Sequence, residues 1–271
     1  MTLPATAVIR LERQDWRLFA TIDDPATRNA MTARLTADLW AILEATREDR
    51  SLRTLILSGS KGAFCAGADL RGADATGEAV ADPIYASNRR GGELFAALDA
   101  HPLVTIAVVD GPAFGGGFGL ACCADFVIAG PGARFALSET SLGLPPAQIA
   151  PYVVGRLGLR IARQLALSGR RLDGAEALAV GLADRVGADE AEINAHLARL
   201  FTDIGRCAPG ANAVTKHLLR TALATDPERY RDAAAWAFRD CLRGPEGREG
   251  VRAFTEKRPP AWAGSGFVKP G

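Results

Sequence analysis

The chain has 271 residues, of which 48% are hydrophobic and 23% are charged, a composition typical of a globular protein with a large core. Its 32 basic and 31 acidic residues nearly cancel, which argues against a surface built to bind nucleic acid or an anionic membrane. The first residues lack the apolar core of a secretory signal, and no apolar run is long enough to span a bilayer, so we expect a cytoplasmic protein.

The first half of the chain indicates strands that alternate with helices. Alternating apolar residues at 5–11 and 17–22, separated by the polar residues 12–15, predict a hairpin. Thr32 can cap a helix that runs to about Asp49, because apolar residues recur there at helical spacing. Three apolar runs rich in β-branched residues are typical of strands buried on both faces, at 52–57, 104–109 and 124–129. This alternation predicts an α/β fold with right-handed crossovers.

The second half changes character and predicts mainly helices. Five stretches have helical periodicity and are separated by glycines and prolines, at 156–167, 173–180, 188–206, 211–224 and 228–243. Residues 71–83 are rich in small and polar side chains with little periodicity, and we expect a mobile loop there. The five cysteines and three histidines have neither metal-ligand spacing nor a positioned partner, so we interpret them as structural and expect no metal site.

Two junctions between a strand and the next helix carry the chemistry. The first, residues 55–70, ends in a run of small residues that allows a ligand to approach the main chain; the alternative is a tight turn with Asp69 as a helix cap. The second, residues 108–125, places three glycines, 115–117, before an apolar helix, where free amides favour a negative oxygen. Amides from two segments that converge on a thioester oxygen would form an oxyanion hole.

Both junctions resemble signature segments of the crotonase superfamily, the enoyl-CoA hydratases and isomerases. The similar segments are 64–70 and 110–117, and residues 25–31 and 253–260 resemble the early coenzyme A-contacting segment and the C-terminal signature of that superfamily. The resemblance implies a crotonase-like spiral of β-β-α units, with the Ala66 and Gly116 amides as the oxyanion hole. The residues implied in substrate and coenzyme A binding are Arg28, Ala30, Ala66, Gly67, Ala68, Asp69, Leu70 and Gly116.

The resemblance also assigns the acid–base chemistry. Glu139 stands where hydratases and isomerases have a catalytic glutamate, although most isolated glutamates are solvated surface residues. In two-glutamate hydratases the other acid lies at the position of Gly119, which cannot titrate. The paired-carboxylate mechanism is therefore in doubt, and we expect a site with one glutamate unless another acid replaces the absent one.

The expected function is an enoyl-CoA hydratase or isomerase that acts on an acyl-CoA thioester, with no cofactor beyond the coenzyme A of the substrate. Double-bond isomerisation by Glu139 alone and a non-catalytic acyl-CoA-binding relative are the alternatives. Residues 143–151 resemble hydratases of branched glutaconyl-CoA thioesters in terpenoid or leucine catabolism, and straight-chain fatty acid metabolism is the other option. The resemblance implies an acyl-CoA core of residues 1–195 and a helical region, 196–271, that forms trimers or paired trimers. In the helical tail from about Ala188 onward, the apolar stripe of Ile193, Leu197, Leu200 and Ile204 is expected at the subunit interface.

Overall fold

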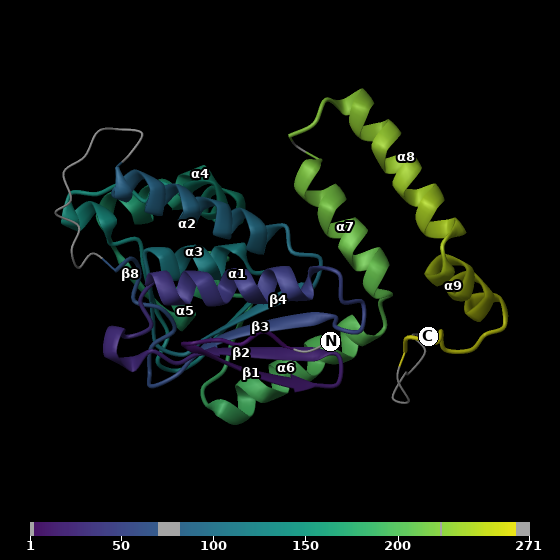
Figure 1. Cartoon of the computed structure of the whole chain (residues 1–271), viewed down its shortest axis with the longest axis horizontal. Coiled ribbons are helices and arrows are strands. Elements are labelled where there is room, and N and C mark those ends of the chain that lie inside the picture. The colour runs from purple at the N-terminus through teal and green to yellow at the C-terminus, as the bar shows by residue number, and fades with distance from the viewer. Residues whose placement is uncertain (1–2, 70–81, 223, 264–271) are drawn as a thin grey trace.

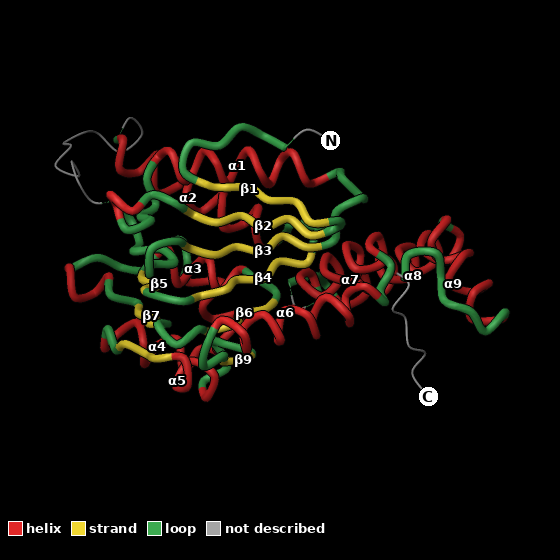
Figure 2. The backbone as a smooth tube through the Cα atoms, turned by 90° about the horizontal axis from the view of Figure 1, so that it is seen from below, coloured by secondary structure: helices red, strands yellow, loops and turns green. Residues whose placement is uncertain are grey.

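A computed structural model describes residues 3–69, 82–222 and 224–263 of the chain, and these residues form two sheets. The main sheet has the strand order β1-β2-β3-β4-β6-β9, and a smaller one has the order β5-β7-β8 (Figure 2). The strands are β1 (Ile9–Gln14), β2 (Arg17–Ile22), β3 (Thr54–Gly59), β4 (Val104–Val109), β5 (Pro112–Phe114), β6 (Phe126–Ala129), β7 (Arg134–Ala136), β8 (Arg171–Asp173) and β9 (Arg185–Val186).

Helices connect these strands and then form the C-terminal region of the chain (Figure 1). The α-helices are α1 (Ala33–Arg47), α2 (Pro83–Asp99), α3 (Gly116–Cys123), α4 (Ala150–Ser168), α5 (Gly174–Ala179), α6 (Glu190–Gly205), α7 (Pro209–Thr221), α8 (Pro227–Arg243) and α9 (Pro245–Thr255), and the 3-10 helices are η1 (Pro25–Thr27) and η2 (Glu139–Leu142). In the described ranges, none of them combines the length and the apolar character needed to cross a bilayer. The predicted α/β class with C-terminal helices is confirmed.

The N-terminal hairpin is present, but its first strand lies further along the chain than predicted. β1 continues through Glu12 and Arg13, which were expected in the turn, and the link to β2 is only Asp15 and Trp16. β1 is the edge of the sheet, so its polar side chains can point into solvent without breaking the pairing with β2. Asp15 has a φ of 57°, which suits so short a turn.

The strands β3, β4 and β6 pair in parallel and are covered on both faces, as their continuous apolar sequences predicted. On β3, Leu55 and Leu57 pack with the cluster that contains the buried face of α1, while Ile56 faces the opposite side. Successive residues of a strand alternate between faces, so a fully apolar run needs a layer on each side. The Thr32 hydroxyl caps α1 by accepting a hydrogen bond from the Leu35 amide at 3.2 Å, as expected.

Helix α6 forms the layer on the second face, and this corrects one prediction. Its buried side chains Ile193, Leu197 and Ile204 pack against Ile56, Ile106 and Ile128 of the sheet, and Leu200 is partly buried beside them. The apolar stripe that we expected at a subunit interface is therefore covered by the same chain, because the second face of the sheet needs a cover. The proposed boundary between residues 195 and 196 falls inside this helix.

The helices α7, α8 and α9 project from the core (Figure 1). Ion pairs join α7 to the core, with Lys216 Nζ 2.7 Å from Asp125 Oδ2 and Arg220 Nη1 3.1 Å from Asp99 Oδ2. After α9 the chain returns, and the Trp262 carbonyl accepts a hydrogen bond of 2.7 Å from Arg53. The C-terminal helices are thus attached to the core at two places.

Helix α9 was not predicted from the sequence, because its proline and glycines resemble helix breakers. Pro245 stands in the first turn, where its missing N–H is not needed. A side chain at Gly247 would meet the Cys241 carbonyl, since an ideal Cβ there lies 2.1 Å from that oxygen. Glycine at this position therefore allows α9 to pack closely against the end of α8.

We expect Leu197→Ala to lower the free energy of unfolding by about 2–5 kcal/mol, because the change opens a cavity between α6 and the sheet. Chemical denaturation at fixed protein concentration measures the loss. Leu167→Ala is the matched control, since Leu167 is 73% exposed. Equal stabilities of the two variants would contradict this placement of α6.

Candidate active site

The two junctions predicted to carry the chemistry are joined by main-chain hydrogen bonds. The Phe64 and Cys65 amides donate to the Pro112 carbonyl at 3.1 and 3.0 Å, and the Phe114 amide donates to the Cys65 carbonyl at 3.0 Å. Cys65 and Ala113 form an isolated parallel bridge. The segments that follow two neighbouring strands, β3 and β4, therefore continue side by side beyond the ends of those strands.

Glycines make this close approach possible. An ideal Cβ on Gly117 would lie 2.3 Å from the Cys65 carbonyl oxygen, and one on Gly111, whose φ is 139°, would lie 2.4 Å from that of Gly62. An ideal Cβ on Gly67, whose φ is 95°, would lie 2.9 Å from the Phe114 carbonyl oxygen. Because these contacts are with main-chain atoms, a larger side chain could not be accommodated by a change of rotamer.

The Ala66 and Gly116 amides lie where these segments meet. Cys65 lies against Gly117, and Gly67 lies against Gly115. Ala66 follows Cys65 and Gly116 precedes Gly117, so both residues lie between these two contacts. Within the ranges that the structure describes, neither amide donates a hydrogen bond, and Gly116 is the first residue of α3. The junctions therefore bring together two available donors, one of them at a helix N-terminus where negative charge is stabilised.

The segment of residues 25–31 lies against the first junction. The Met31 amide donates to the Gly67 carbonyl at 2.8 Å, and Met31 pairs with Ala68 in a parallel bridge. The Met31 side chain also covers Gly116, where an ideal Cβ would be 3.1 Å from Met31 Cγ. This segment therefore supports both of the residues whose amides are available.

Asn29 holds the segment in place, a role that the sequence analysis did not assign. It is 1% exposed and has a φ of 60°, and its amide nitrogen donates to the Ala63 carbonyl at 2.7 Å. Its side-chain oxygen accepts from the Asp24 amide at 2.8 Å. A buried amide with both ends bonded fixes the turn before Phe64 to the segment that precedes Met31. The unusual backbone of a non-glycine residue is a feature that sequence alone does not display.

The other residues implied in coenzyme A binding lie around the same junction. Arg28 is exposed at the end of η1, and Ala30 is buried beside it. Ala68 is exposed and Asp69 is partly exposed, following Gly67. Leu70 and the expected loop up to residue 81 lie outside the described residues, whereas Pro83 begins α2.

Glu139 reaches the same place from a third segment. It begins η2, and its Oε1 atom is 2.9 Å from the position that a Cβ on Gly115 would occupy. Its Oε2 atom is buried and has no hydrogen-bond partner among the described residues. Burial raises the pKa of the Glu139 carboxyl above its ordinary value, while a hydrogen bond from its own backbone amide acts in the opposite direction.

The position of the absent second acid is filled by apolar side chains. An ideal Cβ on Gly119 would lie 2.3 Å from Ile149 Cγ2 and 3.2 Å from Phe95 Cε1. Both residues are buried: Ile149 is 4% exposed and Phe95 is 5% exposed. A glutamate at residue 119 would therefore collide with this wall. The roles of Ile149 and Phe95 could not be predicted from the sequence, because their contact with Gly119 depends on how α2, α3 and the start of α4 pack.

The buried histidine has a structural explanation. The His101 Nε2 atom lies 3.2 Å from both the Thr46 hydroxyl and the Leu43 carbonyl. Burial lowers the pKa of His101 to about 4, because the charged imidazolium is poorly solvated there. The ring is therefore neutral at physiological pH and serves the packing between α1 and the end of α2.

Comparison with known proteins decides the family. The sequence model of the enoyl-CoA hydratase/isomerase family matches residues 18–265, nearly the whole chain. The chain belongs to this family. It is 36% identical over 245 residues to bovine enoyl-CoA hydratase domain-containing protein 2, mitochondrial. This alignment covers 89% of this chain and 82% of that protein.

Solved structures of this family have the same fold. The enoyl-CoA hydratase/isomerase from Marinobacter aquaeolei superimposes with a TM-score of 0.90 at 41% identity, covering 94% of this chain and 99% of that one. Pseudomonas aeruginosa AtuE also gives a TM-score of 0.90, at 44% identity, covering 95% and 100%. These matches confirm the crotonase-like fold, and the relatives named as enoyl-CoA hydratases support an enzyme of the hydratase/isomerase type.

The raised pKa of Glu139 has a consequence for stability. A carboxyl whose pKa is higher in the folded than in the unfolded protein binds more protons when folded, so stability falls as pH rises from its ordinary pKa through the raised value. We expect Glu139→Gln to unfold at higher denaturant concentration than the parent at pH 7. The difference should shrink at a pH below the ordinary carboxyl pKa. A variant less stable than the parent at pH 7 would contradict the unpartnered burial of this carboxylate.

Proposed function

We propose that this chain is an enoyl-CoA hydratase or isomerase that holds its thioester oxygen with the Ala66 and Gly116 amides and transfers protons with Glu139. The observation that carries the proposal is the buried, unpartnered Oε2 atom of Glu139, which lies beside the junction where both amides are available. A carboxylate oxygen that is buried without a hydrogen-bond partner costs stability, so its presence at this junction favours a catalytic purpose.

The two amides would act on the charge that develops during the reaction. When a proton is added or removed next to a thioester, negative charge accumulates on the carbonyl oxygen. Two amides fixed by the hydrogen bonds of the junction need not reorganise to stabilise that charge, and one such donor is typically worth about 3 kcal/mol of barrier. The free N-terminal amides of α3 add a favourable dipole.

Glu139 suits the proton transfer. A general base works best when its pKa is close to the operating pH, and burial moves the pKa of Glu139 in that direction. The carboxylate can take a proton from carbon and return it, or it can activate water for addition to the double bond. This role also argues against a non-catalytic binding protein, in which an unpartnered buried acid would have no purpose.

Hydration and isomerisation use this carboxylate differently. Hydration adds one water across the double bond, its hydroxyl group to one carbon and a proton to the other, and the names of several relatives favour it. Isomerisation needs only one base that moves a proton between two carbons, and the Ile149–Phe95 wall favours it because α3 cannot supply a second acid there. The substrate is an enoyl-CoA of fatty acid or branched acyl-CoA metabolism, held through the segment around Arg28 and Ala30 and through residues 66–69.

We expect Glu139→Gln to lower kcat by about two to four orders of magnitude while thioester affinity is roughly preserved, because glutamine keeps the shape but cannot titrate. Spectrophotometric assays over a panel of short, long and branched enoyl-CoAs give the rates, and calorimetric titration gives the affinity. Glu44→Gln on the exposed side of α1 is the control. A parental rate in Glu139→Gln would make Glu139 a structural residue. Products formed in deuterium oxide distinguish a hydroxyacyl-CoA from a shifted alkene.

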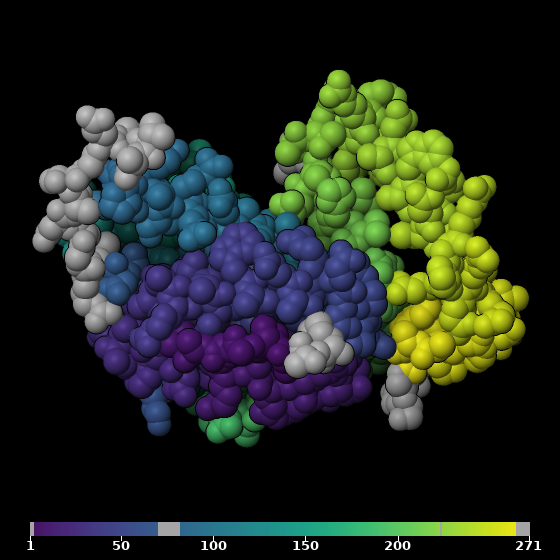
Figure 3. Space-filling model, viewed as in Figure 1, coloured from purple at the N-terminus to yellow at the C-terminus, as the bar shows by residue number. Residues whose placement is uncertain are grey.

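The C-terminal helices support an assembly of several copies. Within the described residues, α7 and α8 bury no side chain, yet α7 to α9 expose large apolar side chains. These are Leu219, Trp236, Phe238, Leu242, Val251 and Phe254. The C-terminal helices project from the core (Figure 3). Projecting helices that expose these apolar side chains need a cover, which we assign to further copies of the chain in a trimer or a pair of trimers.

Light scattering should give the mass of three or six chains for the parent protein. Phe238→Asp should shift that mass towards the single chain, because Phe238 is 70% exposed and a charge there would be buried in an interface. Glu44→Asp, far from these helices in sequence, should leave the mass unchanged. A stable monomer of the parent protein would exclude the assembly.

A further inference from the structure

The segment that carries Glu139 has little to hold it in place. The short helix η2 contains no buried residue, and its own main-chain hydrogen bonds are local, such as the bond of 3.0 Å from the Leu144 amide to the Glu139 carbonyl. Before η2, the Gly115 amide donates to the Ala136 carbonyl at 3.0 Å and so fixes the end of β7. Beyond that strand, the position of Glu139 depends on how η2 is attached to the core.

One side chain of η2 reaches a distant element. The Thr140 hydroxyl donates a hydrogen bond of 2.8 Å to the carbonyl of Ala166, which lies in the last turn of α4. The Ser141 hydroxyl bonds only within the segment, to the Ser138 carbonyl. Within the described ranges, the bond of Thr140 is therefore the side-chain hydrogen bond that joins η2 to another element, and Thr140 directly follows Glu139.

The Ala166 carbonyl is a suitable acceptor for this bond. Helix α4 ends at Ser168, and the last carbonyls of a helix have no partner within it. The Arg170 amide, which would bond to the Ala166 carbonyl in a continuing helix, donates to the Ser168 hydroxyl at 3.2 Å instead. Carbonyls at a helix C-terminus also carry partial negative charge. Because the neighbouring Leu165 is only 4% exposed, Thr140 is bonded to a part of α4 that is packed against the core.

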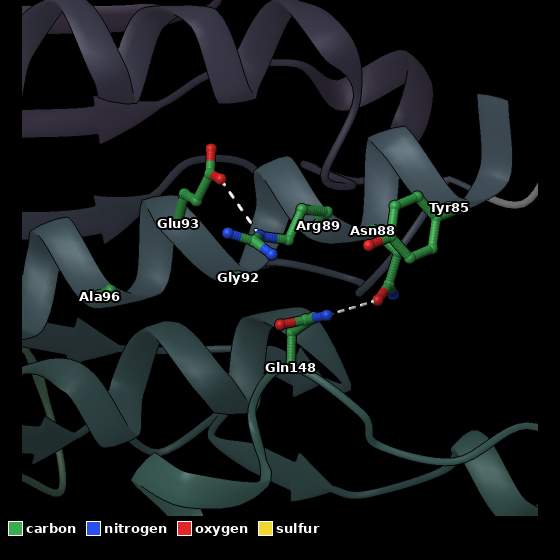
Figure 4. Close-up of a pocket in the computed structure, with 7 residues that line it drawn as sticks. All are labelled: Tyr85, Asn88, Arg89, Gly92, Glu93, Ala96 and Gln148. Atoms are coloured by element: carbon green, nitrogen blue, oxygen red, sulfur yellow. Dashed lines mark hydrogen bonds and ion pairs between the residues drawn. The ribbon is translucent and has the colours of Figure 1, made fainter. Parts of the chain in front are cut away.

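A second side-chain hydrogen bond lies at the other end of the chain segment between η2 and α4. In Figure 4, Gln148 points across a cavity to Asn88 of α2, and its side-chain nitrogen donates to Asn88 Oδ1 at 2.9 Å. Gln148 directly precedes Ile149, so this bond lies beside the apolar wall at Gly119. The bond of Thr140 is therefore the one that lies beside the catalytic carboxylate.

We propose that Thr140 is a positioning residue, whose hydroxyl holds Glu139 against Gly115 in the orientation that proton transfer needs. This inference rests on the proposed function for the role of Glu139. The Thr140 hydroxyl bonds to the main chain of α4, so it acts through the carboxylate and not on the substrate. Proton transfer depends steeply on geometry, and a displacement of a reacting group by about 1 Å can cost roughly a hundredfold in rate.

The first test removes the hydroxyl and keeps the shape of the side chain. We expect Thr140→Val to lower kcat by roughly tenfold to a hundredfold, because Glu139 loses its fixed position. Calorimetric affinity for a saturated acyl-CoA should stay at the parental value, since the Ala66 and Gly116 amides are held by other bonds. Thr140→Ser keeps the hydroxyl and should restore most of the rate. A parental kcat in folded Thr140→Val, or a Thr140→Ser as slow as Thr140→Val, would overturn the inference.

Two further variants protect this test. Thr140 is exposed, so we expect Thr140→Val to fold, and Thr140→Ala should show the same loss of kcat without an added apolar surface. Thr202→Val is the matched control, because Thr202 is also exposed and its hydroxyl donates to a helix carbonyl, that of Ala198, at 2.9 Å. Both of these residues belong to α6, so the control should keep the parental kcat. Thermal melting checks that each variant is folded.

A double variant tests whether Thr140 acts through the carboxylate. Once residue 139 is glutamine and cannot titrate, its exact position no longer affects proton transfer. Adding Thr140→Val to Glu139→Gln should therefore lower kcat much less than adding it to the parent protein. The same fold loss in both backgrounds would show that Thr140 acts independently of Glu139 and would overturn the inference.

The positioning role and the proposed function can fail separately. Slow turnover by Glu139→Gln together with parental turnover by Thr140→Val would keep the proposed function and remove the positioning role. Parental turnover by Glu139→Gln would remove the proposed function, and the positioning role with it.

Discussion

The hydrogen bonds between residues 64–65 and residues 112–114 are the interaction on which the site depends. They extend the parallel pairing of β3 and β4 beyond the sheet, so two segments separated by about fifty residues in sequence arrive as neighbours. Glycines at 67, 111 and 117 allow the backbones to approach, and α3 begins at once after the paired segment. Because main-chain atoms form the pairing, the positions of the Ala66 and Gly116 amides are fixed by the fold itself.

Side chains from neighbouring segments support the two paired segments and complete the site. Met31 and Asn29 brace one junction, and Glu139 enters from η2 against Gly115 at the other. The unpartnered Oε2 atom of Glu139 costs stability, while the fully bonded Asn29 and the apolar core around α3 contribute to it. The site therefore joins a main-chain frame to one titratable group whose pKa burial raises, an arrangement typical of catalytic centres.

Sequence predicted the features of this structure that are encoded locally. The glycine runs, the apolar strands and the Thr32 cap each follow from neighbouring residues, so their identities and approximate positions could be derived. The surface that α6 packs against could not be derived, because an amphipathic stripe such as that of Ile193 and Leu197 can pack against the chain's own sheet as well as against a partner subunit. The contact of Ile149 and Phe95 with Gly119 and the hydrogen bond between Gln148 and Asn88 could not be predicted either, because they join elements whose packing no local sequence pattern specifies.

The most direct test of the central claim is a crystal structure of the Glu139→Gln variant with an enoyl-CoA bound. We predict that the thioester oxygen lies within hydrogen-bond distance of both the Ala66 and Gly116 amides, and that residue 139 lies beside the carbons that exchange protons. A thioester oxygen bound away from either amide would contradict the account.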